Sequence, residues 1–358
     1  MRKWNFSAGP AAIPEEIISE LKDELLEYGQ TGASIIETGH RTEVFSEIAY
    51  QAKKDFIDIL KVPESHEVLF LHGGATHQFS MIPLNFRNIS KKADYVVSGT
   101  WSQKAALEGG KLIDANIIAS SLDNNFSSFP EYKDWKISND SCYIHYCPNE
   151  TIQGISLQQI PEISKPLIAD MSSIILSEPT DVSKFSMIYA SAQKNIGPAG
   201  MSIIIINKDF MNQADKNIPN ILRYDEHAKS NSMLNTPPTF SWYVAGKVFK
   251  WIKKLGGLEY FKKINNNKSK LLYELIDSSD IYRNNISFNQ RSKMNITFKI
   301  EDNDLSKAFL KESSAEGFLN LGGHASVGGF RASIYNAMPQ KGVEELVEFM
   351  KKFEITSS

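Results

Sequence analysis

Two stretches near the start of the chain, residues 14–28 and 42–60, carry apolar residues every three to four positions. This spacing gives each stretch one apolar face, which is typical of an amphipathic helix. In the first stretch, Pro14 stands where it suits the first turn of a helix and Gly29 where it ends one. We therefore expect two helices, each packed by one face against the rest of the protein.

Between residues 67 and 207 the pattern changes to short, continuous apolar runs rich in Val, Ile and Tyr. Continuous runs, rather than alternating ones, indicate strands that are buried on both faces. The stretches 76–86 and 102–112 between them suit helices. Strands that alternate with helices predict the α/β class, with a mainly parallel sheet covered on both faces. The strand candidates are EVLFLHGG, DYVVSG, NIIAS, CYIHYC, PLIAD, SMIYASA and MSIIIIN.

From about Phe240 the pattern changes again, to two long helical stretches over residues 240–257 and 258–278. A smaller α/β unit follows them. Its strand candidates are MNITFKI and FRASIYNA, and it ends in the helical stretch GVEELVEFMKKFE. The chain therefore predicts a large sheet unit joined by helices to a smaller C-terminal unit.

The composition excludes several classes of protein. The 358 residues are 42% apolar and 23% charged with a net charge of −3, so we expect a folded protein without the basic surface that nucleic acid or an anionic membrane requires. Cys142 and Cys147 are the only cysteines and have no metal-ligand spacing, so we expect reduced thiols and no metal site. No signal-peptide core and no run long enough to span a bilayer is present, which predicts a cytoplasmic protein.

Polar residues that directly follow the apolar runs carry the candidate chemistry, because ligands of a parallel sheet bind beyond the carboxyl ends of its strands. The first run ends in Gly73 and Gly74, and Ala75 and Thr76 then begin a predicted helix. Backbone N–H groups beside glycines at a helix start bind anions well. Because two glycines after a strand also form plain turns, the segment is a candidate phosphate cradle with a turn as its alternative.

Asp170 and Lys194 follow two later runs, so a carboxylate and an amine are predicted at the same rim of the sheet. An isolated pair of this kind is usually a surface salt bridge. Trp101 follows a further run and adds an aromatic face. A partly desolvated lysine is a nucleophile toward carbonyl groups. Pyridoxal 5'-phosphate requires all of these parts: an amine for the imine, an acid for the pyridine nitrogen, a phosphate cup and a flat face.

Eight segments between Asn5 and Pro339 resemble, in order, the motifs of the phosphoserine aminotransferases, which are class V aminotransferases of the type I (aspartate aminotransferase-like) fold. The resemblance implies a large cofactor-binding domain of residues 16–252 with a mainly parallel seven-stranded sheet, and a small domain of residues 1–15 and 253–358. It also implies amino-group transfer between O-phospho-L-serine or 3-phosphohydroxypyruvate and 2-oxoglutarate or glutamate, in serine biosynthesis. The segments are NFSAGPAAIP, GHRTEVF, HGGATHQFSMIPLN, NETIQGI, ADMSSIILSEP, SAQKNIGPAG, NTPPTF and GGFRASIYNAMP.

The same resemblance implies roles for the residues that bind the cofactor. Lys194 matches the Schiff-base lysine, which also moves the proton of the substrate α-carbon. Asp170 matches the partner of the pyridine nitrogen, Trp101 the stacking residue and Thr151 the residue that bonds the phenolic oxygen. The phosphate is held by Ala75, Thr76 and Gln193 and, from the second subunit of a homodimer, by Asn235 and Thr236.

The resemblance implies a substrate-binding set as well, in which one position departs from the family. Arg331 matches the arginine that binds the α-carboxylate in a bidentate manner. His324 is present in GHASVGGF, whereas Ala325 stands where the family has an arginine for the substrate phosphate. Losing one charge-assisted contact of about 1.5–3 kcal/mol weakens binding roughly ten- to a hundredfold. The full set is Ser7, Gly9, His40, Arg41, His324 and Arg331. The resemblance implies that His40 and Arg41 reach the substrate phosphate from the neighbouring subunit.

Two explanations of Ala325 compete. The enzyme still uses phosphoserine, with weaker affinity or with help from Arg41, or the site has changed to an amino acid with a smaller or less charged side chain. We take the first, because the other segments of the signature are intact.

Other functions stay open on the residues alone. Two share the fold: a serine or alanine transaminase that acts on glyoxylate, and a cysteine desulfurase, whose mobile nucleophilic cysteine neither Cys142 nor Cys147 matches. A third is a non-catalytic protein that binds a phosphorylated metabolite. Lys194, Asp170 and Arg331 together favour an enzyme over the binding protein.

Overall fold

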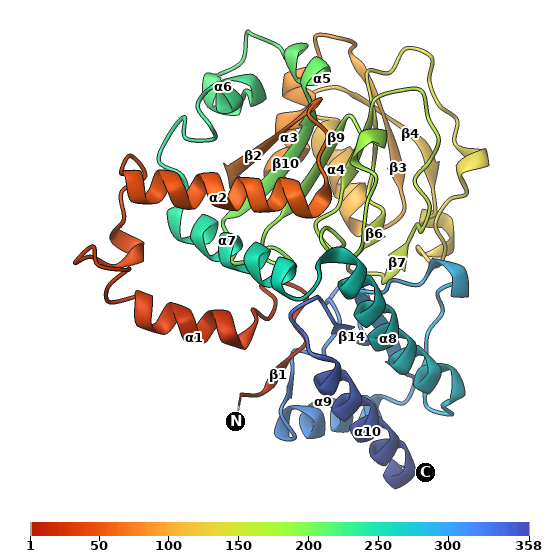
Figure 1. Cartoon of the computed structure of the whole chain (residues 1–358). Helices are drawn as coiled ribbons and strands as arrows, with labels where there is room; N and C mark the ends of the chain where they lie inside the picture. The colour runs from red at the N-terminus through yellow and green to blue at the C-terminus, as the bar shows by residue number, and fades with distance from the viewer. Residues whose placement is uncertain (1, 358) are drawn as a thin grey trace.

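A seven-stranded sheet forms the central layer of the computed structural model, which describes residues 2–357 (Figure 1). Its strands are β2 (His66–His72), β3 (Lys92–Val97), β4 (Asp114–Ser120), β5 (Ile144–Tyr146), β8 (Leu167–Asp170), β9 (Met187–Ser191) and β10 (Met201–Asn207). They lie in the order β2-β10-β9-β8-β5-β3-β4. Strand β10 runs antiparallel to both of its neighbours and the other neighbouring pairs are parallel, which confirms the predicted mainly parallel sheet.

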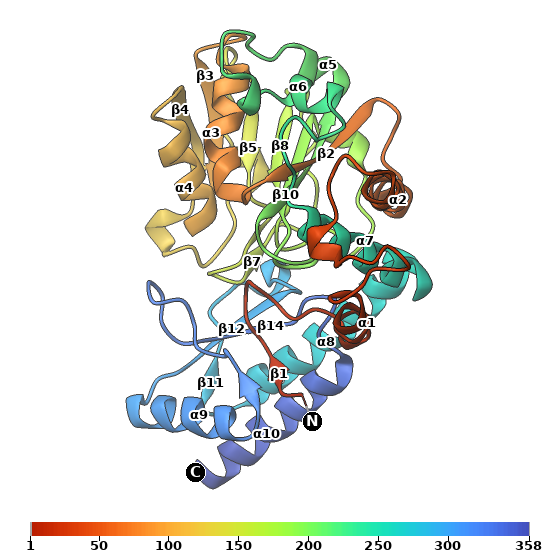
Figure 2. The same cartoon turned by 90° about the vertical axis from the view of Figure 1, so that its left-hand side faces the viewer.

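Helices cover both faces of this sheet (Figure 2). Along β2, Val68 and Phe70 belong to one apolar core, and Leu69 and Leu71 to the other. Because successive side chains point to opposite faces and both faces are buried, the strand reads as a continuous apolar run. The first face is covered by α2 (Glu43–Leu60) and α7 (Thr239–Lys254), and the second by α3 (Ala75–Phe86), α4 (Thr100–Gly109), α5 (Lys208–Asn212) and α6 (Tyr224–Lys229).

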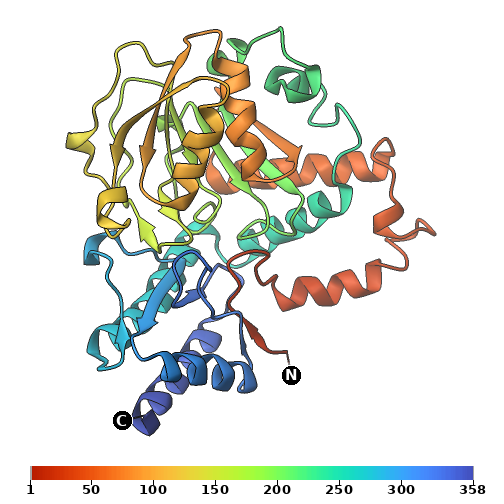
Figure 3. The ribbon, with the colours of Figure 1, turned by 180° about the vertical axis from the view of Figure 1, so that it is seen from behind.

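A smaller unit with its own apolar core lies at one end of the sheet unit. It contains a three-stranded antiparallel sheet of β11 (Tyr282–Arg283), β12 (Asn295–Ile300) and β14 (Phe330–Ser333), with α8 (Gly257–Ser278), α9 (Asn303–Ala315) and α10 (Gln340–Ser357). The first strand, β1 (Trp4–Asn5), pairs in parallel with β13 (Phe318–Leu319). Both ends of the chain therefore lie at this unit, as Figure 3 shows from behind. The predicted domain boundaries stay a prediction.

One predicted helix needs correction, and one long helix was not predicted. The first helix, α1 (Glu15–Glu24), ends earlier than predicted, and Pro14 is the residue before it. Tyr28 nevertheless packs edge to face on Tyr243, with ring centroids 5.3 Å apart. The apolar spacing continues past the helix because a tertiary contact, rather than the helix, partly covers this ring. Helix α9 was not predicted, since it buries only a few side chains, Phe309 among them.

Both cysteines are buried free thiols, as predicted. Burial raises the pKa of Cys142 to about 11 and holds the pKa of Cys147 well above its usual value. A thiol with a raised pKa stays protonated and is a poor nucleophile. Neither cysteine therefore has the properties that a desulfurase requires. Among residues 2–357, no helix combines the length and the apolar character that crossing a membrane demands.

A buried lysine holds the segment that follows β14. Lys268 on α8 is 0% exposed, and its Nζ donates hydrogen bonds of 2.9 Å to the carbonyl oxygens of Ile334, Tyr335 and Met338. Its three N–H bonds thus match three buried acceptors. Because β14 carries Arg331, this contact also supports one wall of the candidate site.

We expect Lys268→Met to lower the free energy of unfolding by about 2–5 kcal/mol, because methionine fills similar space but removes the Lys268 donor from three buried carbonyl oxygens. Of the three, only the Tyr335 oxygen keeps another donor among residues 2–357, the N–H of Met338. Urea unfolding followed by circular dichroism measures the change. Lys270→Met is the matched control on the same helix, because the Lys270 side chain is 71% exposed. The control should change stability by less than about 0.5 kcal/mol. Equal effects of the two substitutions would contradict the assigned role of Lys268.

Candidate active site

The carboxyl ends of β8 and β9 bring Asp170 and Lys194 to one rim of the sheet. Asp170 is the last residue of β8 and pairs with Tyr189 on the neighbouring β9. Lys194 lies in the connection from β9 to β10, and the antiparallel return of β10 keeps this connection at the same rim. The charges of Asp170 and Lys194 are close enough for each to shift the pKa of the other.

Burial controls the charge states of this pair. Asp170 is 4% exposed, and burial raises its pKa, although hydrogen bonds from Ser172 and the charge of Lys194 oppose the shift. Ser172 donates to Asp170 Oδ1 through its backbone N–H at 2.9 Å and its hydroxyl at 2.6 Å. Burial also lowers the pKa of Lys194, against the charge of Asp170. A lowered lysine pKa enriches the free amine, which is the form that attacks a carbonyl carbon.

A short hairpin brings Thr151 to the lysine. The hairpin consists of β6 (Asn149–Glu150) and β7 (Ile155–Ser156). The hydroxyl of Thr151 accepts a hydrogen bond of 2.5 Å from Lys194 Nζ, and its carbonyl oxygen accepts one of 3.3 Å from Arg331 Nη1. One residue thus contacts both the predicted nucleophile and the predicted carboxylate-binding arginine.

The turn before α3 has room only for glycine. Gly73 has φ +81°, and a Cβ there would lie 1.6 Å from His77 Nδ1. A Cβ on Gly74 would lie 2.9 Å from Ser191 Oγ. The two glycines therefore allow the start of α3 to approach the end of β9 closely.

The first turn of α3 is suited to an anion. The helix has no side-chain cap, so within residues 2–357 no side chain competes for its first N–H groups, which include those of Ala75 and Thr76. Gln193 lies beside this turn, because its Oε1 accepts a hydrogen bond from Ser191 Oγ. Ala75, Thr76 and Gln193, the phosphate residues predicted to act within the same subunit, thus lie around the start of α3.

Trp101 lies in the first turn of α4, and its backbone N–H donates a 2.9 Å hydrogen bond to Glu150 Oε2. The ammonium of Lys104 lies 4.8 Å from the centroid of its ring. The indole Nε1 is buried and has no hydrogen-bond partner in the described part of the chain. Trp242 Nε1 in the apolar core is likewise buried without a partner in the described residues, so the unpaired N–H by itself marks no ligand.

Three of the candidate substrate residues, Ser7, Gly9 and Arg331, lie close to Lys194 or to Thr151. Gly9 lies against the lysine segment, since a Cβ on it would come within 3.2 Å of Gln193 Cγ and 3.7 Å of Lys194 Cγ. Ser7 Oγ accepts a 3.4 Å hydrogen bond from the N–H of Gly9. Arg331 is half-buried and lines a cavity of about 800 Å³.

An exposed loop forms another part of this cavity wall, through Gly323 and Ser326. His324 is exposed in this loop, and its Nδ1 is hydrogen-bonded to Ser326 Oγ at 2.8 Å. Ala325 is exposed beside it and brings no charge. The histidine predicted for the substrate phosphate therefore belongs to the loop that borders the cavity of Arg331.

Four predicted residues form no hydrogen bond with Lys194 or Asp170 within the described residues 2–357, where Lys194 bonds Thr151 and Asp170 bonds Ser172. His40 and Arg41 precede α2, and Asn235 and Thr236 precede α7; all are exposed except His40, which is half-buried. Their action from a second subunit stays a prediction.

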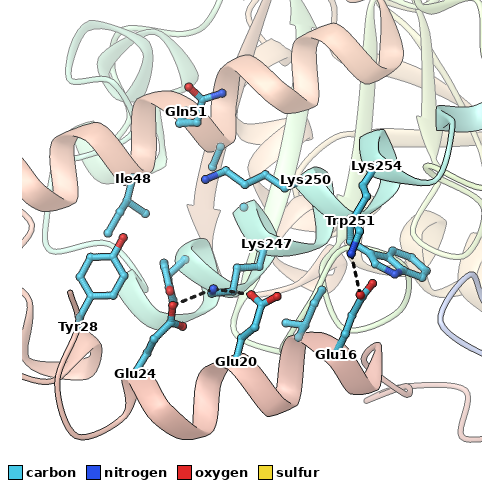
Figure 4. Close-up of a pocket in the computed structure, with 14 residues that line it drawn as sticks. Glu16, Glu20, Glu24, Tyr28, Ile48, Gln51, Lys247, Lys250, Trp251 and Lys254 are labelled. Atoms are coloured by element: carbon cyan, nitrogen blue, oxygen red, sulfur yellow. Dashed lines mark hydrogen bonds and ion pairs between the residues drawn. The ribbon is translucent and has the colours of Figure 1, made fainter.

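A separate cavity of about 520 Å³ lies between α1, α2 and α7 (Figure 4). Lys247 of α7 forms ion pairs of 2.8 and 2.9 Å with Glu20 and Glu24 of α1, and Lys254 forms one of 3.1 Å with Glu16. None of the predicted site residues lines this cavity. Its ion pairs fasten α1 to α7, and we assign it no catalytic part.

Residues 3–346 of the chain match the family model of the class-V aminotransferases. The chain belongs to the class-V aminotransferase family. A similar protein is the phosphoserine aminotransferase of Vesicomyosocius okutanii subsp. Calyptogena okutanii, which is 47% identical over 355 residues and 99% of both chains.

Two solved structures resemble this class-V aminotransferase closely. The phosphoserine aminotransferase from Bacillus circulans subsp. alkalophilus superimposes with a TM-score of 0.97 at 42% identity, over 100% of this chain and 99% of that one. The pyridoxal-phosphate-bound phosphoserine aminotransferase from Trichomonas vaginalis gives a TM-score of 0.94 at 42% identity, over 98% and 100%. The predicted fold class is confirmed.

The residues of this class-V aminotransferase fit pyridoxal 5'-phosphate. The buried carboxylate of Asp170 suits a protonated pyridine nitrogen, the uncapped start of α3 suits a phosphate, and Lys194 supplies the amine. The chemistry of the donors therefore agrees with the cofactor that the sequence predicted.

Sequence reasoning missed two polar residues of this class-V aminotransferase. Ser172 bonds Asp170 and also accepts a 3.0 Å hydrogen bond from the N–H of Ser191, so it joins β8 to β9. The serine two positions after a strand-ending aspartate was the available signal, since such a serine often bonds the carboxylate. Glu150 is the second, and its signal was a charged residue next to Thr151, shortly after the apolar run CYIHYC.

Proposed function

We propose that this protein is a phosphoserine aminotransferase that uses pyridoxal 5'-phosphate. It transfers the amino group between O-phospho-L-serine and 2-oxoglutarate, with 3-phosphohydroxypyruvate and glutamate as the other pair, in serine biosynthesis. The observation that carries the proposal is that Lys194 and Arg331 both bond Thr151, while the charge of Asp170 acts on Lys194. The 47% identity to a phosphoserine aminotransferase along 99% of both chains supports this choice within the family.

Each of these side chains has a defined task. The guanidinium of Arg331, oriented by the carbonyl of Thr151, binds the substrate α-carboxylate. The cofactor, when bound, withdraws electrons from the substrate α-carbon and so acidifies its C–H bond. Lys194 as a free amine takes that proton on Nζ and returns it to the product. Asp170, held by Ser172, keeps the pyridine nitrogen protonated.

The proposal includes a homodimer in the cytoplasm. The segment on either side of His40 and Arg41 exposes two large apolar side chains, since Ile36 is 56% and Tyr50 62% exposed. A dimer contact would remove this apolar surface from water. A second copy covering it would bring these residues to the partner's site, and the free thiols suit a reducing compartment. Light scattering that finds a species of one chain's mass would contradict the dimer.

The experiment that tests the substrate is steady-state kinetics with O-phosphoserine and 2-oxoglutarate. We expect turnover with a raised KM, because Ala325 supplies no cation to the substrate phosphate. Ala325→Arg should lower the KM for phosphoserine roughly ten- to a hundredfold by adding one charge-assisted contact. Its control, Ala325→Met, adds bulk without charge and should leave the KM unchanged. Turnover of phosphoserine no better than that of serine or alanine would replace the proposal by a serine or alanine transaminase.

A further inference from the structure

Glu150 is a carboxylate with 0% exposure at the centre of the hairpin that carries Thr151. Its Oε2 accepts a 2.9 Å hydrogen bond from the N–H of Trp101, and its Oε1 accepts a 2.8 Å bond from the N–H of Ser102. These are successive backbone amides in the first turn of α4. The side chain thus caps α4 from a different segment of the chain.

The hairpin and the helix start fit each other closely. A Cβ on Gly99 would lie 2.4 Å from Glu150 Cγ and 2.8 Å from Gln153 Oε1. Gln153 also bonds Thr100 twice: its Nε2 donates to Oγ1 at 2.7 Å, and its Oε1 accepts from the backbone N–H at 3.2 Å. Two side chains of the hairpin therefore hold one turn of helix in a single position.

The contact between Glu150 and α4 links the two residues that would touch the cofactor ring. Trp101, predicted to stack on the ring, is bonded directly to Glu150. Thr151, predicted to bond the phenolic oxygen, is the next residue along the chain and contacts Lys194. The position of the aromatic face relative to the hydroxyl is thus set through one carboxylate.

We propose that Glu150 is a positioning residue, which fixes the ring of Trp101 relative to the hydroxyl of Thr151 and so shapes the cofactor site before the cofactor binds. The inference rests on the proposed function, because it takes the two residues to be cofactor contacts. Glu150 itself touches neither cofactor nor substrate in this assignment.

The ionised form of Glu150 suits this task. Two N–H donors at a helix N-terminus favour the carboxylate, whereas burial raises its pKa to about 7. The titratable groups that face it are Cys147, Asp170 and Lys194 from the neighbouring strands and the lysine segment. Acidification through pH 7 therefore protonates Glu150, and a protonated carboxyl accepts the two amide bonds less well.

Hydrogen exchange of the cofactor-free enzyme tests the contact first. In Glu150→Gln, the amide group keeps the size of the side chain but accepts well from only one of the two N–H groups. We expect the peptide that contains Trp101 and Ser102 to exchange about ten- to a hundredfold faster than in the wild type. A peptide from β10 should exchange as in the wild type, which shows that the variant is folded. Glu108→Gln, at the other end of α4, is the matched control and should change neither peptide.

Cofactor titration tests the consequence. We expect pyridoxal 5'-phosphate to bind Glu150→Gln about ten- to a hundredfold more weakly at pH 8. Wild-type affinity should fall up to about tenfold further than that of the variant between pH 8 and pH 6, because only the wild type loses the Glu150 charge. Comparison of the two profiles removes the contributions of the neighbouring groups that both proteins share.

The outcomes separate the inference from the proposed function. Wild-type exchange, affinity and pH dependence in Glu150→Gln would overturn the positioning role. Failure of the wild type itself to bind pyridoxal 5'-phosphate would overturn the proposed function instead. If Glu150→Gln does not fold, Glu150→Asp serves: we expect it to keep the pH dependence with weaker binding, and a pH-independent affinity would overturn the role.

Discussion

Lys194→Ala is expected to abolish transamination, with kcat reduced by roughly 10⁴-fold or more, because the side chain acts both as nucleophile and as proton carrier. Burial lowers the pKa of Lys194 and prepares its amine for both tasks. No other lysine contacts Thr151 in the described part of the chain, so no neighbour replaces it. An assay that couples the formation or consumption of 2-oxoglutarate to a dehydrogenase measures the fall in kcat.

Mass spectrometry after borohydride reduction gives a second measurement. The wild-type chain should carry the cofactor covalently at Lys194, and Lys194→Arg, which keeps the charge but not the nucleophile, should carry none. Lys184→Ala replaces an exposed lysine and should behave as the wild type. Covalent labelling of another lysine in the wild type, or substantial activity in Lys194→Ala, would contradict the assignment of the catalytic amine.

Arg331→Lys should lower kcat/KM for glutamate and phosphoserine alike by roughly 30- to 1000-fold, which corresponds to about 2–4 kcal/mol. A lysine ammonium cannot make the two parallel hydrogen bonds that a guanidinium makes to a carboxylate. Both substrates lose the same contact, because both carry an α-carboxylate. Steady-state kinetics with each substrate measures the effect, and the cofactor absorbance should stay as in the wild type.

The control for this substitution is Arg87→Lys. Arg87 lies just after the C-terminal end of α3, whereas the candidate phosphate cradle lies at the N-terminal start of that helix. Its side chain pairs with Asp215 at 3.9 Å. We expect it to change neither kinetic constant by more than about twofold, as is usual for surface substitutions. A loss confined to phosphoserine in Arg331→Lys would show instead that Arg331 binds the side-chain phosphate.

The convergence of the main site residues could be predicted from the sequence, because this convergence depends on strand topology alone. The carboxyl ends of parallel strands meet at one rim, so Asp170, Trp101 and Gly74 were expected together once the runs before them were taken as strands. Lys194 follows the same rule, since the strand after it returns antiparallel and keeps the connection at that rim. The residue types at the rim indicated pyridoxal 5'-phosphate chemistry, and the resemblance to a family added the role of each residue. These roles still await the tests above.

Contacts between segments distant in sequence were not predictable in this way. Glu150 bonds two amides that lie about fifty positions earlier, and no local spacing marks such a partner. The early end of α1 is similar, because Tyr28 lies beyond the helix and packs on a ring of α7. In each case the partner is chosen by packing, which one sequence does not reveal.

The amino-acid sequence by itself determined the strand runs, the order of the elements and the residue types at the strand ends, because side-chain period and turn chemistry are local properties. Only the tertiary structure decided which side chains meet. It placed Thr151 between Lys194 and Arg331, buried Asp170 and Glu150, and left Arg41 and Asn235 exposed. Distances and burial depend on how distant segments pack, and these set the pKa values and hydrogen bonds on which catalysis rests.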